Sequence, residues 1–392
     1  MKLLFYRYGS ICEPDIIQGF YELGHEIITC DDQITHPDRS ISESVSLVSN
    51  LLLEHPVDFV FSINFFPFLS EVCNIFHLRY LSWTVDSPVM ELYSAAISND
   101  WNRMFLFDKA QYEEFSHYNL AHIFHLPLAA NVSNKELLFK QTPNSMHQKF
   151  AHDIAFVGSL YTEKCPYDKL INPPAYLKGY LDAIMASQEK IYGYYFISDL
   201  LSDTIIDAFK EHLPNFYEYP GKSYLTDRET LSQLYIGNKI TALERLHTME
   251  ALTAIHPVDI YTGSDTNSFM NLTNHGFANS VTEMPLIFHN AGINLNTTSK
   301  AIRSGLPQRI FDILSCGGFV LTNYQSELAD LFHPGEDLAV YGSLDELQEL
   351  SVYYLSHDKL RSEMAMAGLD PLKEHHSYEL RLATMIVKAF EA

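Results

Sequence analysis

The sequence has few positive charges, and this shortage argues against one class of partner. Its 392 residues include 26 lysines and arginines against 49 aspartates and glutamates, which gives a formal net charge of −23. A surface with this balance repels phosphate backbones and anionic lipid surfaces. We therefore expect no nucleic acid as a principal partner.

Long apolar runs and paired cysteines are missing as well. No stretch of the sequence approaches the roughly 20 apolar residues that a membrane span needs, and MKLLFYRYGS is interrupted too early for a signal peptide. The five cysteines are odd in number, scattered and never in CxxC spacing, a pattern typical of reduced thiols. These absences predict a cytoplasmic protein without a membrane span.

Two kinds of chemical motif are also absent. The sequence has no GxSxG element, so it gives no support to a serine hydrolase. Its 18 histidines include His117, His122 and His125 and the adjacent His375 and His376, but neither group has the spacing of metal ligands. We expect no bound metal and no cofactor.

What the sequence does contain is an alternation of short apolar runs with helical patterns. A chain of 392 residues exceeds the roughly 250–300 residues that one core usually serves, so two domains are expected. Such alternation is typical of βαβ units and a parallel sheet. The first series predicts strands at KLLFYR, HEIITC, DFVFSI, YLSWTV and RMFLFD and helices at 16–23, 42–53, 69–76, 90–97 and 109–118.

A second series begins at DIAFVGS and continues, after a tyrosine-rich helical stretch, with strands VDIYTG, INLN, FVLT and DLAVY. We predict an α/β fold of two Rossmann-like, doubly wound domains that face a cleft, with a helical insertion in the second. The expected boundaries are 1–132 for the first domain, 133–152 for a linker, 153–375 for the second domain, 165–250 for its insertion and 376–392 for a helix packing back on the first domain.

Polar and charged residues gather after the strand INLN, where ligands bind in such sheets. The small polar candidates there are Asn294, Asn296, Thr297 and Thr298. Gly305 and Pro307 then mark a helix start, whose N–H groups attract anions. Arg309 would bind phosphate oxygens and Asp312, on the same helical face, a ribose diol. The alternative is an ordinary surface ion pair, worth about 0.3–0.5 kcal/mol.

The run from FHNAGINLNTTSK to RSEMAMAG, residues 288–368, resembles the C-terminal half of the CgeB-like glycosyltransferases, which have the GT-B architecture. YLSWTVDSP, MFLFD, HLPLA and FVGSLY are similar to the N-terminal region of that family. Many GT-B enzymes bind the donor ribose with the glutamate of E-A-x-A-x-G, and Asp312 in DILSCGG matches it. Ser304 and Gly305 stand where E-x7-E relatives have another glutamate, so the resemblance implies no stereochemistry.

The resemblance implies transfer of a sugar from a nucleoside diphosphate sugar, preferably a UDP-sugar, to a protein or glycan acceptor without a metal. GT-B enzymes stabilise the leaving diphosphate with basic side chains and helix dipoles. Arg309 is the first candidate for this catalytic role. Lys164, which follows the turn at Gly158 and Ser159, is the second and Lys300 the third, although each lysine could equally be a solvated surface residue. No DxD pair bounded by strand signals supports a metal-dependent GT-A enzyme.

The acceptor side is expected in the first domain. Asp86 in WTVDSP follows an apolar strand, where a general base would activate an acceptor hydroxyl. Its alternative role is a helix cap, which is common for aspartate. Asp108 at the end of MFLFD is a further candidate, and the loop RYGSICEPD brings Gly9 and Ser10 to the same rim.

A second hypothesis is a catalytically inactive nucleotide-sugar-binding protein of the same fold. It would keep the site of Arg309 and Asp312 but lack a working base. Both hypotheses require donor binding, whereas only the first requires turnover.

Overall fold

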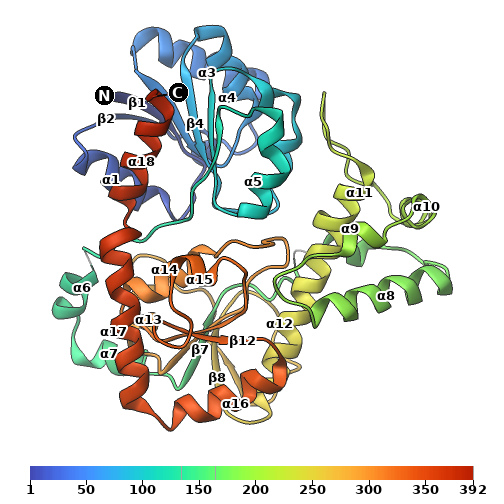
Figure 1. The fold of residues 1–392 in the computed structure, drawn as a ribbon, viewed down its shortest axis with the longest axis vertical. Coiled ribbons are helices and arrows are strands. Elements are labelled where there is room, and N and C mark those ends of the chain that lie inside the picture. Colours follow the sequence, from blue (N-terminus) through green and yellow to red (C-terminus); the bar gives the residue numbers. More distant parts are fainter. Residues whose placement is uncertain (134, 164, 392) are drawn as a thin grey trace. The chain divides into compact units, whose positions relative to one another are not determined.

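The computed structural model describes residues 1–133, 135–163 and 165–391, and it divides into two units (Figure 1). Unit 1 comprises residues 1–130, 219–225 and 375–392, and unit 2 comprises 131–218 and 226–374. Each unit is built on a parallel β-sheet flanked by helices. The predicted α/β class with two doubly wound sheets is therefore confirmed.

The sheet of unit 1 has, among the described residues, six strands in the order β2-β1-β3-β4-β5-β6. The chain leaves β1 to form β2 on one side and then places β3 on the other side of β1. Ligands of open α/β sheets bind beyond the carboxyl ends of the strands at such a reversal, the switch point. The strands are β1 (Lys2–Tyr6), β2 (Glu26–Cys30), β3 (Phe59–Ile63), β4 (Arg79–Trp83), β5 (Asn102–Leu106) and β6 (Ile123–His125).

Helices cover the sheet of unit 1, and this explains why its inner strands are almost entirely buried. All five residues of β3 are buried, as expected for a parallel strand covered on both faces. The last helix, α18 (Tyr378–Glu391), lies beside α1 (Figure 1), and a Cβ atom added to Gly19 would lie only 2.8 Å from Leu382. The other helices are α1 (Glu13–Glu22), α2 (Asp32–Thr35), α3 (Ile41–Glu54), α4 (Pro67–Phe76) and α5 (Lys109–Phe115), followed by the 3-10 turn η3 (Ser116–Tyr118).

The helix predicted over 90–97 is wrong. The chain forms two separate 3-10 turns, η1 (Met90–Tyr93) and η2 (Ala95–Ser98), because Ser94 between them is extended and bridges Ser223. The backbone N–H of Ala95 also donates to the carbonyl of Lys222 at 3.0 Å. Residues 219–225, expected within the insertion of the second domain, thus pack with unit 1.

The sheet of unit 2 has the strand order β12-β11-β10-β7-β8-β9 within the part of the chain that is described. The chain runs from β7 to β8 and β9 on one side and then places β10 on the other side of β7, so the switch point lies between β7 and β10. The strands are β7 (Ile154–Val157), β8 (Val258–Tyr261), β9 (Leu272–Asn274), β10 (Ile293–Asn296), β11 (Val320–Asn323) and β12 (Ala339–Tyr341).

Most helices of unit 2 lie in segments that were predicted to be helical, but the predicted linker is helical as well. The stretch predicted as a linker contains α6 (Lys135–Gln141) and α7 (Asn144–Lys149), both without a buried residue. The apolar residues of α6 are consecutive and α7 has a single apolar residue, so neither shows the helical spacing from which an apolar face could be recognised. The later helices are α13 (Met284–Asn290), α14 (Gln308–Ser315), α15 (Leu328–Leu331), α16 (Leu344–Leu355) and α17 (Asp358–His375).

The helical insertion has a hydrophobic core of its own, and α12 (Asn238–Thr253) joins it to the sheet. Ile240 of α12 packs in the insertion core with Leu177 and Phe209, whereas Met249 and Leu252 pack in the sheet core. Figure 1 shows the insertion helices gathered beside α12. They are η4 (Pro166–Lys169), α8 (Ala175–Glu189), α9 (Ile197–Leu200), α10 (Asp203–His212), α11 (Asp227–Glu229) and the π-helical η5 (Thr230–Gly237). Among all described helices, none has the length and apolar character needed to cross a membrane.

Candidate functional site

Arg245 joins the two loops that flank the switch point of unit 2. Its guanidinium donates from Nη1 to the carbonyl of Ser159, after β7, and from Nη2 to the carbonyl of Thr297, after β10, the latter at 2.7 Å. The ring centres of Tyr161 and Phe156 lie 4.7 and 5.6 Å from the guanidinium carbon. A positive charge is therefore fixed at the place where the topology favours a ligand.

Arg309 brings a second positive charge to the same region. Burial lowers the pKa of Arg245 below its ordinary value; Tyr161 and Glu244 oppose this, and the charge of Arg309 adds to it. The two guanidinium groups are thus within electrostatic reach of each other. Like charges disfavour each other, so a bound anion would favour the charged form of both arginines.

Arg309 and Asp312 do form an ion pair across one turn of α14. The distance from Arg309 Nη1 to Asp312 Oδ2 is 3.4 Å, and the two side chains are 21% and 25% exposed. Gln308 donates to the other carboxylate oxygen at 3.0 Å. Pro307, expected as the first helical residue, is instead the N-cap of α14, which begins at Gln308. Gln308 and Arg309 each donate to one oxygen of the carboxylate, and a carboxylate oxygen has a second lone pair that can accept another hydrogen bond.

The small polar side chains of β10 and its loop are buried, and Asn294, Asn296 and Thr298 hydrogen-bond within the protein. Asn294 donates to the last turn of α13 at 2.9 Å. Asn296 donates to the hydroxyls of Thr298 and Thr322 at 3.0 and 2.9 Å, and the backbone N–H of Thr298 donates to Asn323 at 2.8 Å. These bonds shape the loop after β10. Donor binding by Asn294, Asn296, Thr297 and Thr298 stays a prediction.

The turn after β7, at Gly158 and Ser159, is organised around an acidic side chain. The hydroxyls of Ser159 and Ser264 donate to the two oxygens of Glu163 at 2.6 and 2.7 Å. Burial acts to raise the pKa of Glu163, but these hydrogen bonds bring the pKa below its ordinary value. The carboxylate therefore stays ionised beside the turn. Lys164, the neighbouring candidate, lies outside the described residues.

Lys300, expected as a possible phosphate ligand, forms a buried ion pair instead. Its Nζ lies 3.4 Å from Glu244 Oε1, with side chains 8% and 1% exposed. The same Nζ lies 3.9 Å from the ring centre of Tyr192. Burial raises the pKa of Glu244, and Lys300 acts to lower it. The pair ties the loop after β10 to α12, one residue before Arg245.

Asp86 lies at the switch point of unit 1 with partners from neighbouring strands. Its Oδ2 accepts from Asn64 Nδ2 at 2.7 Å and from the Tyr8 hydroxyl at 3.2 Å. Tyr8 follows β1, Asn64 follows β3 and Asp86 follows β4, and Asn64 also accepts from the backbone N–H of Val85 at 3.0 Å. The N-cap of η1 is Val89, so the helix-cap alternative for Asp86 does not describe its position.

The surroundings of Asp86 suit a proton acceptor. Asp86 is exposed, so the hydroxyl group of an acceptor can reach its carboxylate from the solvent. Burial raises the pKa of Tyr8 well above its ordinary value, and the negative charge of Asp86 adds to this. Tyr8 therefore stays a hydrogen-bond donor to the carboxylate. Tyr8 and Asn64 fix the carboxylate in place without neutralising it.

The side chain of Glu13 binds the backbone N–H groups of the loop that contains Gly9 and Ser10. One carboxylate oxygen accepts from the backbone N–H groups of Tyr8, Gly9 and Ser10 at 2.9, 2.8 and 3.1 Å, and the other accepts from Arg7 at 2.9 Å. Amides of this kind, before a helix, otherwise bind phosphate. An internal carboxylate takes that position in unit 1, which leaves the anion-binding role to unit 2.

Asp108 has a structural role. It is fully buried and caps α5 by accepting from the backbone N–H of Ala110 at 3.0 Å. Its predicted part in acceptor binding has no further support.

Three residues of the two candidate sites were not predicted from the sequence: Arg245, Tyr8 and Asn64. Asn64 had the same signal as Asp86, a polar residue directly after an apolar strand.

Residues 244–387 match the model of a family described as glycosyl transferase-like. The matched segment starts at Glu244 and includes Arg245, Arg309 and Asp312. The search of curated proteins returned no match.

Solved structures show the fold of the whole chain. HepE of Anabaena, in complex with UDP-glucose, is 10% identical, with a TM-score of 0.59 and full coverage of both chains. Sucrose-phosphate synthase of Thermosynechococcus elongatus is 8% identical, with a TM-score of 0.56 and coverage of 100% of this chain and 99% of that one. A glycosyltransferase of Rickettsia africae is 11% identical, with a TM-score of 0.55 and coverage of 100% and 98%. The chain therefore has the GT-B fold of glycosyltransferases, and its segment 244–387 matches a glycosyl transferase-like family.

Proposed function

We propose that the chain is a glycosyltransferase of CgeB-like type that moves a sugar from a UDP-sugar to a protein or glycan acceptor without a metal ion. The observation that carries this proposal is Arg245, which holds the loops after β7 and β10 together with Arg309 in electrostatic reach. Both arginines lie in the segment that matches the glycosyltransferase-like family. HepE, which shares the fold, was solved with UDP-glucose.

In this proposal the two arginines bind the diphosphate of the donor. A guanidinium presents several N–H groups in a plane and matches phosphate oxygens with paired hydrogen bonds. The start of α14 adds the positive end of a helix dipole. As the bond between sugar and diphosphate breaks, negative charge grows on the leaving UDP, and fixed positive groups stabilise it. Asp312 accepts from the ribose.

Asp86 is the proposed base for the acceptor. The acceptor oxygen forms a bond to the anomeric carbon, the bond from that carbon to UDP breaks, and the acceptor proton moves to the Asp86 carboxylate. A single displacement of this kind inverts the configuration at the anomeric carbon. Tyr8 and Asn64 act as positioning residues, because each holds the carboxylate by a hydrogen bond.

Arg309→Ala is expected to weaken UDP binding about 10- to 100-fold, since a hydrogen bond to a charged group contributes about 1.5–3 kcal/mol. Isothermal titration of the full chain with UDP measures the change. Lys178→Ala is the matched control: it removes one positive charge from an exposed i,i+4 pair with Asp182 in the insertion, and its UDP affinity should equal that of the wild type. Unchanged affinity in Arg309→Ala would reject the donor site.

Incubation with a panel of nucleotide sugars and water separates the enzyme from an inactive binding protein. Slow release of UDP from one donor is expected from an enzyme, because water replaces the acceptor. Binding of UDP without release from any donor, with or without an acceptor, would favour the inactive protein of the same fold.

A further inference from the structure

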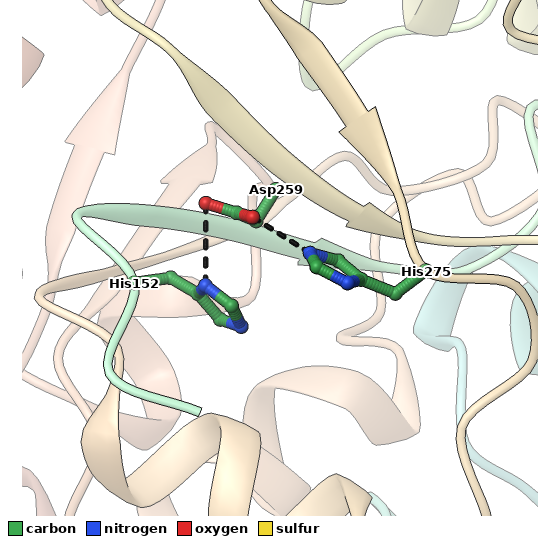
Figure 2. Close-up of side chains that lie close together, drawn as sticks. All are labelled: His152, Asp259 and His275. Atoms are coloured by element: carbon green, nitrogen blue, oxygen red, sulfur yellow. Dashed lines mark hydrogen bonds and ion pairs between the residues drawn. The ribbon is translucent and has the colours of Figure 1, made fainter. Parts of the chain in front are cut away.

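Three side chains that are far apart in the sequence converge on one face of the sheet in unit 2 (Figure 2). His152 precedes β7, Asp259 lies in β8 and His275 directly follows β9. His152 Nδ1 lies 3.2 Å from one oxygen of Asp259, and His275 Nε2 lies 2.7 Å from the other. One ligand atom from each residue lies within 4.8 Å of those from the other two. All three side chains thus turn a possible ligand atom toward a common point.

The ligand set and its spacing fit a zinc-type ion. Zinc binds imidazole nitrogen and carboxylate oxygen, and open sites use three protein ligands with water as the fourth. Ligands at about 2.0–2.2 Å from a tetrahedral ion are about 3.3–3.6 Å apart. The separation of 3.2 Å between His152 and Asp259 is close to this spacing. Nε2 of His275 lies nearer to the carboxylate, at 2.7 Å, and the three ligand atoms lie within 4.8 Å of one another, so His275 has to shift when an ion binds. Imidazole ligands favour transition metals over magnesium or calcium.

Tyr261 contacts both histidines and holds them in this arrangement. Its hydroxyl lies 2.8 Å from His152 Nε2, and its ring stacks on His275 with centres 4.8 Å apart. Ligating histidines usually have their second ring nitrogen fixed in this way. With Nε2 bonded to Tyr261, Nδ1 of His152 is the nitrogen that faces Asp259.

The cluster is separate from the proposed donor site. His152 lies two residues before the start of β7, whereas Ser159 and Arg245 lie beyond its carboxyl end. Its side chains are 8%, 25% and 33% exposed for His152, Asp259 and His275, which leaves an approach for an ion and for a bound water. β9 is a short edge strand that pairs with β8, so a shared ion would fasten its end to the start of β7.

We propose that His152, Asp259 and His275 bind one divalent transition-metal ion of the zinc class, with water in the fourth position. The ion clamps the loop before β7, strand β8 and the end of β9. It takes no part in sugar transfer, which stays metal-independent.

Calorimetric titration of the full, untagged chain with zinc chloride, after removal of metal with EDTA, tests the site. One zinc per chain is expected, together with a rise in melting temperature by mass action; magnesium chloride should give neither. Asp259→Asn and His275→Ala should abolish the one-to-one binding. His333→Ala is the control, because the exposed His333 faces the buried Asp337 at 3.3 Å, and this pair belongs to no cluster of three ligand side chains among the described residues. This variant should bind zinc as the wild type does.

Tyr261→Phe gives a graded test that keeps the ring and the fold. It removes only the hydroxyl that orients His152, so zinc affinity should fall about 10- to 100-fold. Cobalt(II) added to the wild type should give the visible absorption of a tetrahedral nitrogen and oxygen site. Absence of zinc binding by the wild type would overturn the proposal, as would wild-type affinity in both Asp259→Asn and His275→Ala. UDP affinity should be equal with and without EDTA, and a requirement for metal would refute the separate clamp.

Discussion

Asp86→Asn is expected to lower the rate of sugar transfer about 10²- to 10⁴-fold, the usual contribution of a general base. Asparagine has nearly the same volume as aspartate, but its amide cannot take the acceptor proton. The affinity for UDP should be unchanged, because the proposed donor contacts lie in unit 2. Turnover with the best donor and acceptor pair and titration with UDP measure the two quantities.

Two further variants separate catalysis from position and from net charge. Tyr8→Phe removes one hydrogen bond to Asp86 and keeps the carboxylate. A hydrogen bond to a charged group contributes about 1.5–3 kcal/mol, so the rate should fall by at most about 10- to 100-fold, because Asn64 still holds the carboxylate. Asp38→Asn makes the same charge change at an exposed position of unit 1 and should transfer at the wild-type rate. A wild-type rate in Asp86→Asn would show that another group accepts the proton.

The parallel sheets were predictable because their physical cause is local. A central strand such as β3, FVFSI, is covered on both faces and reads as a continuous apolar run in the sequence. Strand β9, by contrast, has only three residues, LTN, at the edge of its sheet. A segment this short shows neither an apolar run nor an alternation of apolar and polar residues. The helix expected over 90–97 failed because pairing of Ser94 with Ser223, far along the chain, breaks it.

The candidate sites were predictable only where a strand end marks them. Asp86 follows an apolar strand, and the rule for parallel sheets then places it at the ligand-binding edge. Arg245 lies inside α12, where helical periodicity does not tell which residue meets the switch point. The cluster of His152, Asp259 and His275 shows the same limit. Sequence motifs for metal sites recognise ligands that lie close together in the chain, whereas these three residues lie before β7, in β8 and after β9.

Lys300→Met is expected to lower the free energy of unfolding by about 3–5 kcal/mol, the usual cost of leaving one partner of a buried ion pair unpaired. Methionine keeps most of the volume of the lysine stem, so the variant isolates the loss of charge beside Glu244. Urea denaturation of the full chain measures the change. Lys178→Met, in the exposed pair with Asp182, is the control and should stay within about 0.5 kcal/mol of the wild type.

The double variant Lys300→Met with Glu244→Met should recover the lost stability. Replacing a whole buried ion pair by apolar residues of similar volume is often neutral or stabilising. Recovery would show that the single variant suffers from an isolated carboxylate rather than from poor packing. A double variant as unstable as Lys300→Met would contradict this view and indicate a packing defect around Tyr192.

The deficit of Lys300→Met should also depend on pH with a defined sign. Burial already raises the pKa of Glu244 and Lys300 acts to lower it, so removal of Lys300 raises the pKa in the folded state further. The ordinary pKa of glutamate, which applies to the unfolded chain, is about 4.3. Above this pH the unfolded chain has lost the proton of Glu244 while the folded variant still binds it. The stability of the variant therefore falls as pH rises from this value through the pKa of the folded state. The deficit relative to the double variant, which lacks the carboxyl, should therefore be smallest in acid and grow toward alkaline pH. Denaturation at a series of pH values decides the matter, and a deficit that is constant or largest in acid would show that Glu244 is not the group left unpaired.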